Sequence, residues 1–183
     1  MQEDNDAEKC VYTLYVKTGP LITSGTDSKI SVTLGDAAGK SVWIPNLEDW
    51  GLMGPTHDYF ETGNLDIFSV RGPCIPTPIC RLNITSDGWG PNPGWYCEYV
   101  EVTSTGPHIK CSDSTFYVEQ WLAIDVPPYK LTSIIDGCDT TTTTTTAATN
   151  SHARKKGAPY VFGKHQQHHV RLPPQGSSSF ASQ

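Results

Sequence analysis

Long apolar runs are missing from this sequence, and so are the signatures of the common enzyme classes. No segment approaches the roughly 20 consecutive apolar residues that a membrane-spanning helix needs. No GxSxG, HExxH, Walker or GxGxxG motif occurs, and no serine is placed for a catalytic triad. We therefore expect neither a membrane-spanning protein nor an enzyme. An enzyme acting on lipid or sugar is the weakest alternative; it stays open because the separation of two carboxylates is a three-dimensional property.

Basic residues are scarce in most of the chain. Up to Cys138 there are eight Lys/Arg and eighteen Asp/Glu, a balance of 8 − 18 = −10, whereas from Asp139 onward five Lys/Arg and one Asp give +4. Phosphate backbones require a basic footprint, so the acidic part argues against a nucleic-acid partner. Such a surface suits hydrated cations better.

A basic and then apolar leader is missing from the N-terminus "MQEDNDAEK", so no signal peptide is expected within this chain. The cysteines nevertheless point to an oxidising compartment, because an even count without a CxxC pair favours disulfides over a zinc site. We expect three bridges, with free buried thiols as the alternative, among Cys10, Cys74, Cys80, Cys97, Cys111 and Cys138. Their pairing is open, since six cysteines allow about fifteen arrangements.

The secretory pathway, endoplasmic reticulum or extracellular, is the location that disulfides imply, with a signal peptide already removed. The sequon Asn83-Ile84-Thr85 agrees with this route and makes Asn83 a candidate for N-glycosylation.

No stretch shows a sustained helical period; short alternating segments separated by Gly, Pro, Asn and Asp occur instead. They predict strands over 10–19, 28–36, 41–45, 64–70, 79–85, 95–102, 108–113 and 114–123. The fold class is therefore all-β, an antiparallel sandwich of two packed sheets. We divide the chain into an acidic leader (1–9), the sandwich (10–138) and a tail (139–183). The tail opens with seven threonines and carries "HQQHH" (His165, His168, His169), a loose transition-metal candidate, and its low apolar content predicts disorder.

The segment "GWYCEYVEV" has two mixed faces. Strict alternation would put Trp95, Cys97, Tyr99 and Glu101 on one face and Tyr96, Glu98, Val100 and Val102 on the other. Neither face is cleanly apolar.

Two turn-rich stretches offer the hard oxygen ligands that Ca²⁺ prefers. In "TGPLITSGTDSKISV" these are the Gly25 carbonyl and the Asp27 carboxylate, unless Asp27 only caps an Asx turn. In "GPTHDYFETGNLDIF" the candidates Asp58, Glu61, Asn64 and Asp66 do not follow EF-hand spacing, and a solvated acidic loop is the alternative.

A third stretch, "TSDGWGPNPGW", combines Asp87 and Asn92 with two tryptophans. Oxygen ligands beside amphipathic rings suit a membrane interface, so Trp89 and Trp95 are candidates for membrane or partner contact. Core packing is the alternative, and it is favoured for Trp95 because that residue lies in a predicted strand.

Four motifs in this order, "YTLYVKTG", "SGTDSKISVTLGD", "FETGNLDIF" and "PGWYCEYVEV", resemble the PLAT/LH2 domain family, and in particular the small stand-alone PLAT proteins of the plant stress type. The resemblance covers roughly 10–123, with an extension to Cys138, and leaves the tail outside. It implies an eight-stranded sandwich of two four-stranded sheets. It also implies a non-catalytic, stress-responsive module, similar to those that bring lipoxygenases and lipases to membranes or partner proteins, often with Ca²⁺.

The resemblance also implies which residues bind the ion. The family's ligands map to Gly25 and Asp27, to Asp87 or Asn92, and to the loop of Asp58, and a disulfide from Cys97 to a neighbouring strand is typical of the plant type. This chain has Thr23 or Ser24, and Asn92, where some members carry acidic residues, and fewer carboxylates weaken an ion site. The leading expectation is a non-catalytic module that attaches to a lipid surface or a protein partner, with Ca²⁺ as a candidate cofactor. Calcium-independent capture of a protein partner is the alternative.

Overall fold

The computed structural model describes residues 9–76 and 78–138. The predictions for the leader and for the tail from Asp139 onward fall on 1–8 and 139–183 and lie outside the described residues. The elements are β1 (Lys9–Thr18), β2 (Ile30–Gly35), β3 (Ser41–Ile44), a 3-10 helix (Glu48–Trp50), β4 (Leu65–Pro73), β5 (Arg81–Ser86), β6 (Trp95–Thr105), β7 (Ser112–Leu122) and β8 (Thr132–Asp136). Within these ranges no helix has both the length and the apolar character to cross a membrane.

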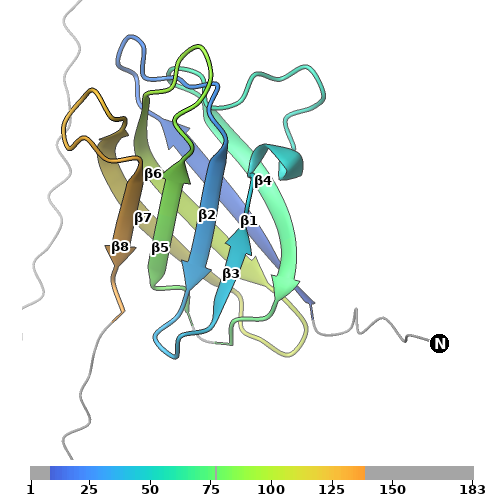
Figure 1. Ribbon diagram of the computed structural model, residues 1–183. Coiled ribbons are helices and arrows are strands. Elements are labelled where there is room, and N and C mark those ends of the chain that lie inside the picture. The colour runs from blue at the N-terminus through green and yellow to red at the C-terminus, as the bar shows by residue number, and fades with distance from the viewer. Residues whose placement is uncertain (1–8, 77, 139–183) are drawn as a thin grey trace, which may run out of the picture. The chain divides into compact units, whose positions relative to one another are not determined.

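Two antiparallel four-stranded sheets pack face to face, with strand orders β4-β1-β6-β7 and β3-β2-β5-β8 (Figure 1). Alternate residues of each strand face the core, as in β1, where Tyr12, Leu14 and Val16 are fully buried. This confirms the predicted sandwich. The prediction of a separate strand over 108–113 is wrong, because residues 106–111 form the β6–β7 turn, and the short strand β8 was not predicted.

Antiparallel pairing gathers four connections at one end of the sandwich, the upper end in Figure 1. They are 19–29, 45–64, 87–94 and 123–131, and together they are called the loop end. The candidate ligand stretches, far apart in the sequence, all lie in this set. The sheet topology therefore brings them to the same end.

The mixed character of "GWYCEYVEV" has a structural cause. The β1–β6 register shifts so that Thr18 pairs with Cys97 while Lys17 pairs with Tyr99, leaving Glu98 unpaired. A β-bulge of this kind reverses which alternate residues face inward. Trp95 and Cys97 are therefore buried on the same side as Val100, which corrects the strict alternation predicted for this strand.

Two disulfides, not three, join the described cysteines: Cys10–Cys74 and Cys80–Cys138. Cys97 is buried and free, and Cys111 is exposed and free, which corrects the predicted bridges at both positions. Cys97 lies opposite Gln120 near the loop end, whereas Cys111 precedes the Ser104–Ser112 pair at the other end. Nine strand residues separate their levels by roughly 25–30 Å, far beyond the reach of one disulfide. Burial raises the pKa of the Cys97 thiol, so this thiol stays protonated and unreactive.

Tyr12 ties β1 to the segment that follows β4. Its hydroxyl donates to the Pro73 carbonyl oxygen (2.7 Å) and accepts from the Ile75 N–H (2.9 Å). Tyr12→Phe leaves that buried N–H without a partner, and we expect the free energy of unfolding to fall by about 1–3 kcal/mol in urea denaturation of the oxidised protein. An unchanged value would contradict a stabilising role for this hydroxyl.

The same hydroxyl predicts a pH dependence. Burial, with a smaller contribution from Asp36, raises the pKa of Tyr12 despite the Ile75 hydrogen bond. A raised folded-state pKa gives stability that is complete below the unfolded pKa of about 10 and is lost as pH rises above it. The unfolding free energy of the wild type should therefore decline more steeply above that pH than that of Tyr12→Phe.

Candidate functional site

Three carboxylates converge at the loop end. Asp27 comes from the β1–β2 connection, and Asp58 and Glu61 come from the β3–β4 connection; their ligand oxygens lie within 4.8 Å of one another. Asp27 and Asp58 are exposed and Glu61 is half-buried. This set is called the carboxylate cluster. Carboxylates this close repel one another, and hard oxygen donors on two loops fit a Ca²⁺ ion that would remove the repulsion.

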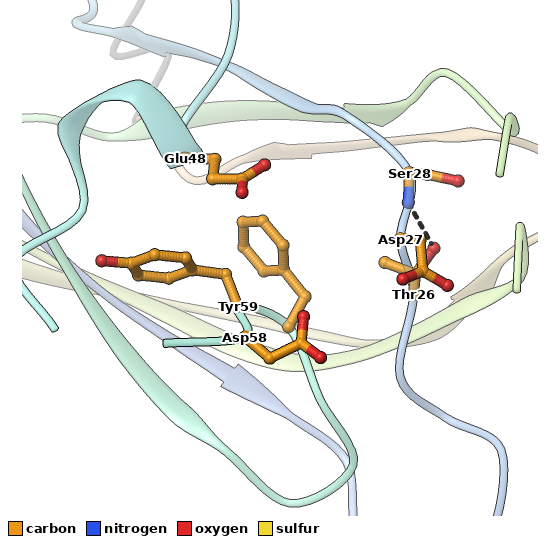
Figure 2. Close-up of a pocket in the computed structure, with 7 residues that line it drawn as sticks. Thr26, Asp27, Ser28, Glu48, Asp58 and Tyr59 are labelled. Carbon is orange, nitrogen blue, oxygen red and sulfur yellow. Dashed lines mark hydrogen bonds between the residues drawn. The ribbon is translucent and has the colours of Figure 1, made fainter. Parts of the chain in front are cut away.

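A cavity of about 100 Å³ lies beside the cluster. Figure 2 shows Asp27 and Asp58 on facing segments, with Glu48 of the 3-10 helix nearby. Sequence analysis missed Glu48, since nothing in "SVWIPNLEDW" distinguishes it from a solvated acid. Its position beside the cavity adds negative potential to the site.

The Asp27 loop is fixed by hydrogen bonds of its buried neighbours. The Thr26 hydroxyl donates to the Asn92 carbonyl oxygen and the Ser28 hydroxyl to the Trp89 carbonyl oxygen, each at 2.7 Å. Because Thr26 and Ser28 point inward, the side chain of Asp27 between them points to solvent. The 87–94 connection thus holds the segment that carries Asp27 in place.

Gly25 allows the 19–29 and 45–64 connections to approach each other closely. A Cβ at Gly25 would lie 2.9 Å from the Thr62 backbone nitrogen and 3.2 Å from a Glu61 carboxylate oxygen. The predicted role of Gly25 as a carbonyl ligand stays a prediction. What the structure shows is a glycine required by packing against the cluster.

Asp66, one of the four oxygen side chains of the second stretch, lies outside the cluster. It is fully buried, and its carboxylate contacts His57 Nε2 (2.6 Å) and accepts from the Phe60 N–H (2.7 Å). These contacts anchor the segment that carries Asp58 to the start of β4. Asp66 is a positioning residue for the cluster.

The 87–94 connection contributes to the site differently from what the sequence predicts. The Asn92 side-chain amide donates to an Asp27 carboxylate oxygen at 3.1 Å, so Asn92 lies beside the cluster. Asp87 lies outside the cluster: one of its oxygens accepts from the Lys29 and Trp89 N–H groups, each at 3.1 Å. Asp87 therefore caps an Asx turn, and its prediction as a cation ligand finds no support in this geometry.

The two tryptophan candidates, Trp89 in the 87–94 connection and Trp95 at the start of β6, have opposite environments. Trp89 is 78% exposed. Trp95 is fully buried, packs edge-on against Phe60 with ring centroids 5.3 Å apart, and donates from Nε1 to the Thr18 hydroxyl at 3.0 Å. The prediction of Trp95 as a membrane or partner contact is wrong, because its ring fills the core.

Exposed apolar side chains share the loop end with the carboxylate cluster. Most of the large hydrophobic residues that the described part of the chain exposes lie at the loop end: Leu21, Ile22, Trp50, Leu52, Met53, Trp89, Ile124 and Tyr129. Exposed apolar side chains gathered at one end of a protein and bordered by polar groups are typical of interaction surfaces.

The chain resembles known proteins in sequence. The family model of Embryo-specific protein 3, (ATS3), matches residues 1–127. PLAT domain-containing protein 1 of Arabidopsis thaliana is 50% identical over 152 residues, which cover 82% of this chain and 84% of that protein. PLAT domain-containing protein 3 of the same plant is 55% identical over 104 residues, covering 56% of this chain and all of that protein.

The fold resembles one part of larger enzymes. Coral 8R-lipoxygenase, for which calcium activation via a C2-like domain is described, matches with a TM-score of 0.54 at 22% identity, over 69% of this chain and 16% of the lipoxygenase. A calcium-dependent 11R-lipoxygenase matches with a TM-score of 0.50 at 18% identity, over 69% of this chain and 17% of that chain. At such identities the likeness shows the fold alone. The matches in sequence go further, and they show that the chain belongs to the Embryo-specific protein 3 (ATS3) family and, as its four ordered motifs predict, is a PLAT domain protein.

Proposed function

We propose that this protein is a non-catalytic module that attaches to anionic lipid surfaces through its loop end with the assistance of Ca²⁺. The observation that carries the proposal is that the carboxylate cluster and most of the exposed large apolar side chains of the described residues lie at the same end of the sandwich. Calcium activation in the structurally similar lipoxygenases supports it.

The eight exposed large apolar side chains of the loop end given above, called the apolar rim, supply attraction to the bilayer. Ile22 is 90% exposed and Trp89 is 78% exposed, and they come from two different connections of the loop end. Burying one such side chain in the interface is worth about 1.5–3 kcal/mol. Tryptophan in particular is favoured at headgroup level. There its apolar ring contacts the acyl chains, and its polar N–H remains in the hydrated headgroup region.

The charge of the loop end explains why a cation is needed. Its four connections carry seven acidic residues and two lysines, a balance of 2 − 7 = −5: Asp27, Glu48, Asp49, Asp58, Glu61, Asp87 and Asp125 against Lys29 and Lys130. Such a surface repels anionic headgroups. A Ca²⁺ ion held by Asp27, Asp58 and Glu61 would offset this charge and, with open coordination positions, accept phosphate oxygens.

The location and biological context belong to the same proposal. The two disulfides support an oxidising compartment, and we place the protein in the secretory pathway. A stress-responsive role is what the family resemblance implies.

Co-sedimentation of the oxidised full chain with vesicles tests the proposal. We expect binding to phosphatidylcholine–phosphatidylserine vesicles with Ca²⁺ and its loss in chelator. Binding in both conditions would instead assign attachment to basic residues such as those of 139–183. Binding in neither would favour calcium-independent capture of a protein partner.

The apolar rim is tested separately with a matched pair of tryptophans. Trp89→Ala should weaken vesicle binding about 10- to 150-fold, as the loss of about 1.5–3 kcal/mol implies. Trp43, 69% exposed, lies on the sheet face in β3, opposite Thr33 in the middle of β2, so Trp43→Ala should leave binding unchanged. Equal effects of the two variants would contradict insertion through the loop end.

A further inference from the structure

The outer face of the β3-β2-β5-β8 sheet has a row of side chains that the proposed function does not use. Trp43 pairs with Thr33, Thr33 with Asn83, and Asn83 with Ile134, so one line crosses all four strands. Asn83 lies in this row and begins the only N-x-Ser/Thr sequon of the chain, Asn83-Ile84-Thr85.

The strand geometry turns both recognition residues of the sequon to solvent. Ile84 is fully buried, as is Leu82, so Asn83 and Thr85 share the outer face and are half-buried there. The Thr85 hydroxyl donates to Asn83 Oδ1 at 3.3 Å. Asn83 Nδ2 donates no hydrogen bond to any other described residue. A substituent on Nδ2 therefore extends away from the core without breaking a contact.

We propose that Asn83 carries an N-linked glycan. In this step Nδ2 of Asn83 forms a bond to C1 of the first sugar of a polyisoprenyl-pyrophosphate-linked oligosaccharide. The C1–O bond to pyrophosphate breaks, and the Nδ2 proton leaves with the pyrophosphate. Such donors work in the oxidising compartment that the two disulfides indicate.

The neighbours of Asn83 fit a sugar chain. Ile134, on the adjacent strand, is 66% exposed, and Trp43, two strands away on the other side, is 69% exposed. With strands about 4.8 Å apart, these side chains lie about 5 Å and about 10 Å from Asn83 along the row. The C–H face of a pyranose ring packs on such apolar groups, so the first sugars cover Ile134 and Trp43.

The glycan would leave the loop end free. Asn83 lies in the middle of β5, on a sheet face, whereas the carboxylate cluster lies beyond the strand ends. Vesicle binding and glycosylation are therefore separable, and each can fail without the other.

The site is tested by expressing the full chain behind a signal peptide in plant cells and recovering the secreted protein. Treatment with a peptide N-glycosidase in heavy-oxygen water should increase electrophoretic mobility and convert Asn83 into ¹⁸O-labelled aspartate, found by mass spectrometry. Thr85→Ser keeps the sequon and should keep the shift. Asn83→Gln and Thr85→Val should abolish it, and valine retains the β-branched shape that β5 favours. Recovery of the wild type with unmodified Asn83, from cells that glycosylate a control protein, would overturn the proposal.

The contact between the glycan and Trp43 is tested separately, by thermal unfolding. Removing the glycan should lower the Tm of the wild type more than that of Trp43→Ala, because only the wild type loses the ring contact. Equal losses would overturn the contact with Trp43.

Discussion

Replacing Asp27 and Asp58 together with asparagine is expected to lower the affinity for Ca²⁺ by at least about a hundredfold. Two of the three charged ligands are lost while the shape of the side chains is kept. Attraction between unit charges at 4 Å is about 4 kcal/mol at an effective dielectric of 20, and each 1.4 kcal/mol is about tenfold in affinity. Isothermal titration of the oxidised full chain with CaCl₂ measures the change.

The matched control is Asp49→Asn with Asp125→Asn. Both residues are exposed at the loop end, and the double variant removes the same charge outside the cluster. It should retain most of the affinity. If both double variants lose affinity equally, diffuse surface charge rather than the cluster attracts the ion.

Calcium should also raise the Tm of the wild type, because an ion that binds only the folded state adds about 2.7 kcal/mol at a hundred times its Kd. The Asp27→Asn, Asp58→Asn variant should lose this rise. An equal rise in the variant would place the bound ion elsewhere.

The second large effect is expected at Trp95, in the core. Trp95→Ala should lower the free energy of unfolding by about 3–5 kcal/mol, because it empties the site against Phe60 and removes the donor to Thr18. Trp89→Ala, on an exposed ring, should change it by no more than about 0.5 kcal/mol. Urea denaturation of the oxidised variants measures both.

Trp95→Phe is the milder variant. It keeps a six-membered ring in the core but loses the N–H and part of the indole, so a loss of about 1–3 kcal/mol, smaller than that of Trp95→Ala, is expected. Similar stability of the Trp95→Ala and Trp89→Ala variants would contradict the structural assignment of the two rings.

The sequence alone determined the fold class. Alternation in segments such as 10–19 and 79–85 fixes which side chains can be buried, because successive residues of a strand point to opposite faces. Four motifs in order determined the family. Asp27 and Asp58 were also recognisable as candidates, since acidic residues in turn-rich stretches are exposed and offer hard oxygens.

Tertiary structure decided which candidates meet. The antiparallel topology brings the Asp27 and Asp58 loops together and recruits Glu61, while the Trp89 N–H and the distant Lys29 N–H take up the Asp87 carboxylate. The spacing of these residues along the sequence does not predict which of them meet, because contacts between loops depend on how two sheets pack.

The same holds for the strand faces and the cysteines. A bulge at Glu98 buries Trp95 and Val100 on one side, against simple alternation. The register of β6 with β7 sets Cys97 and Cys111 at opposite ends of the sandwich, so neither can bridge the other. Local pattern thus determined which residues can face the core, and long-range strand pairing alone decided which of them come within bonding distance.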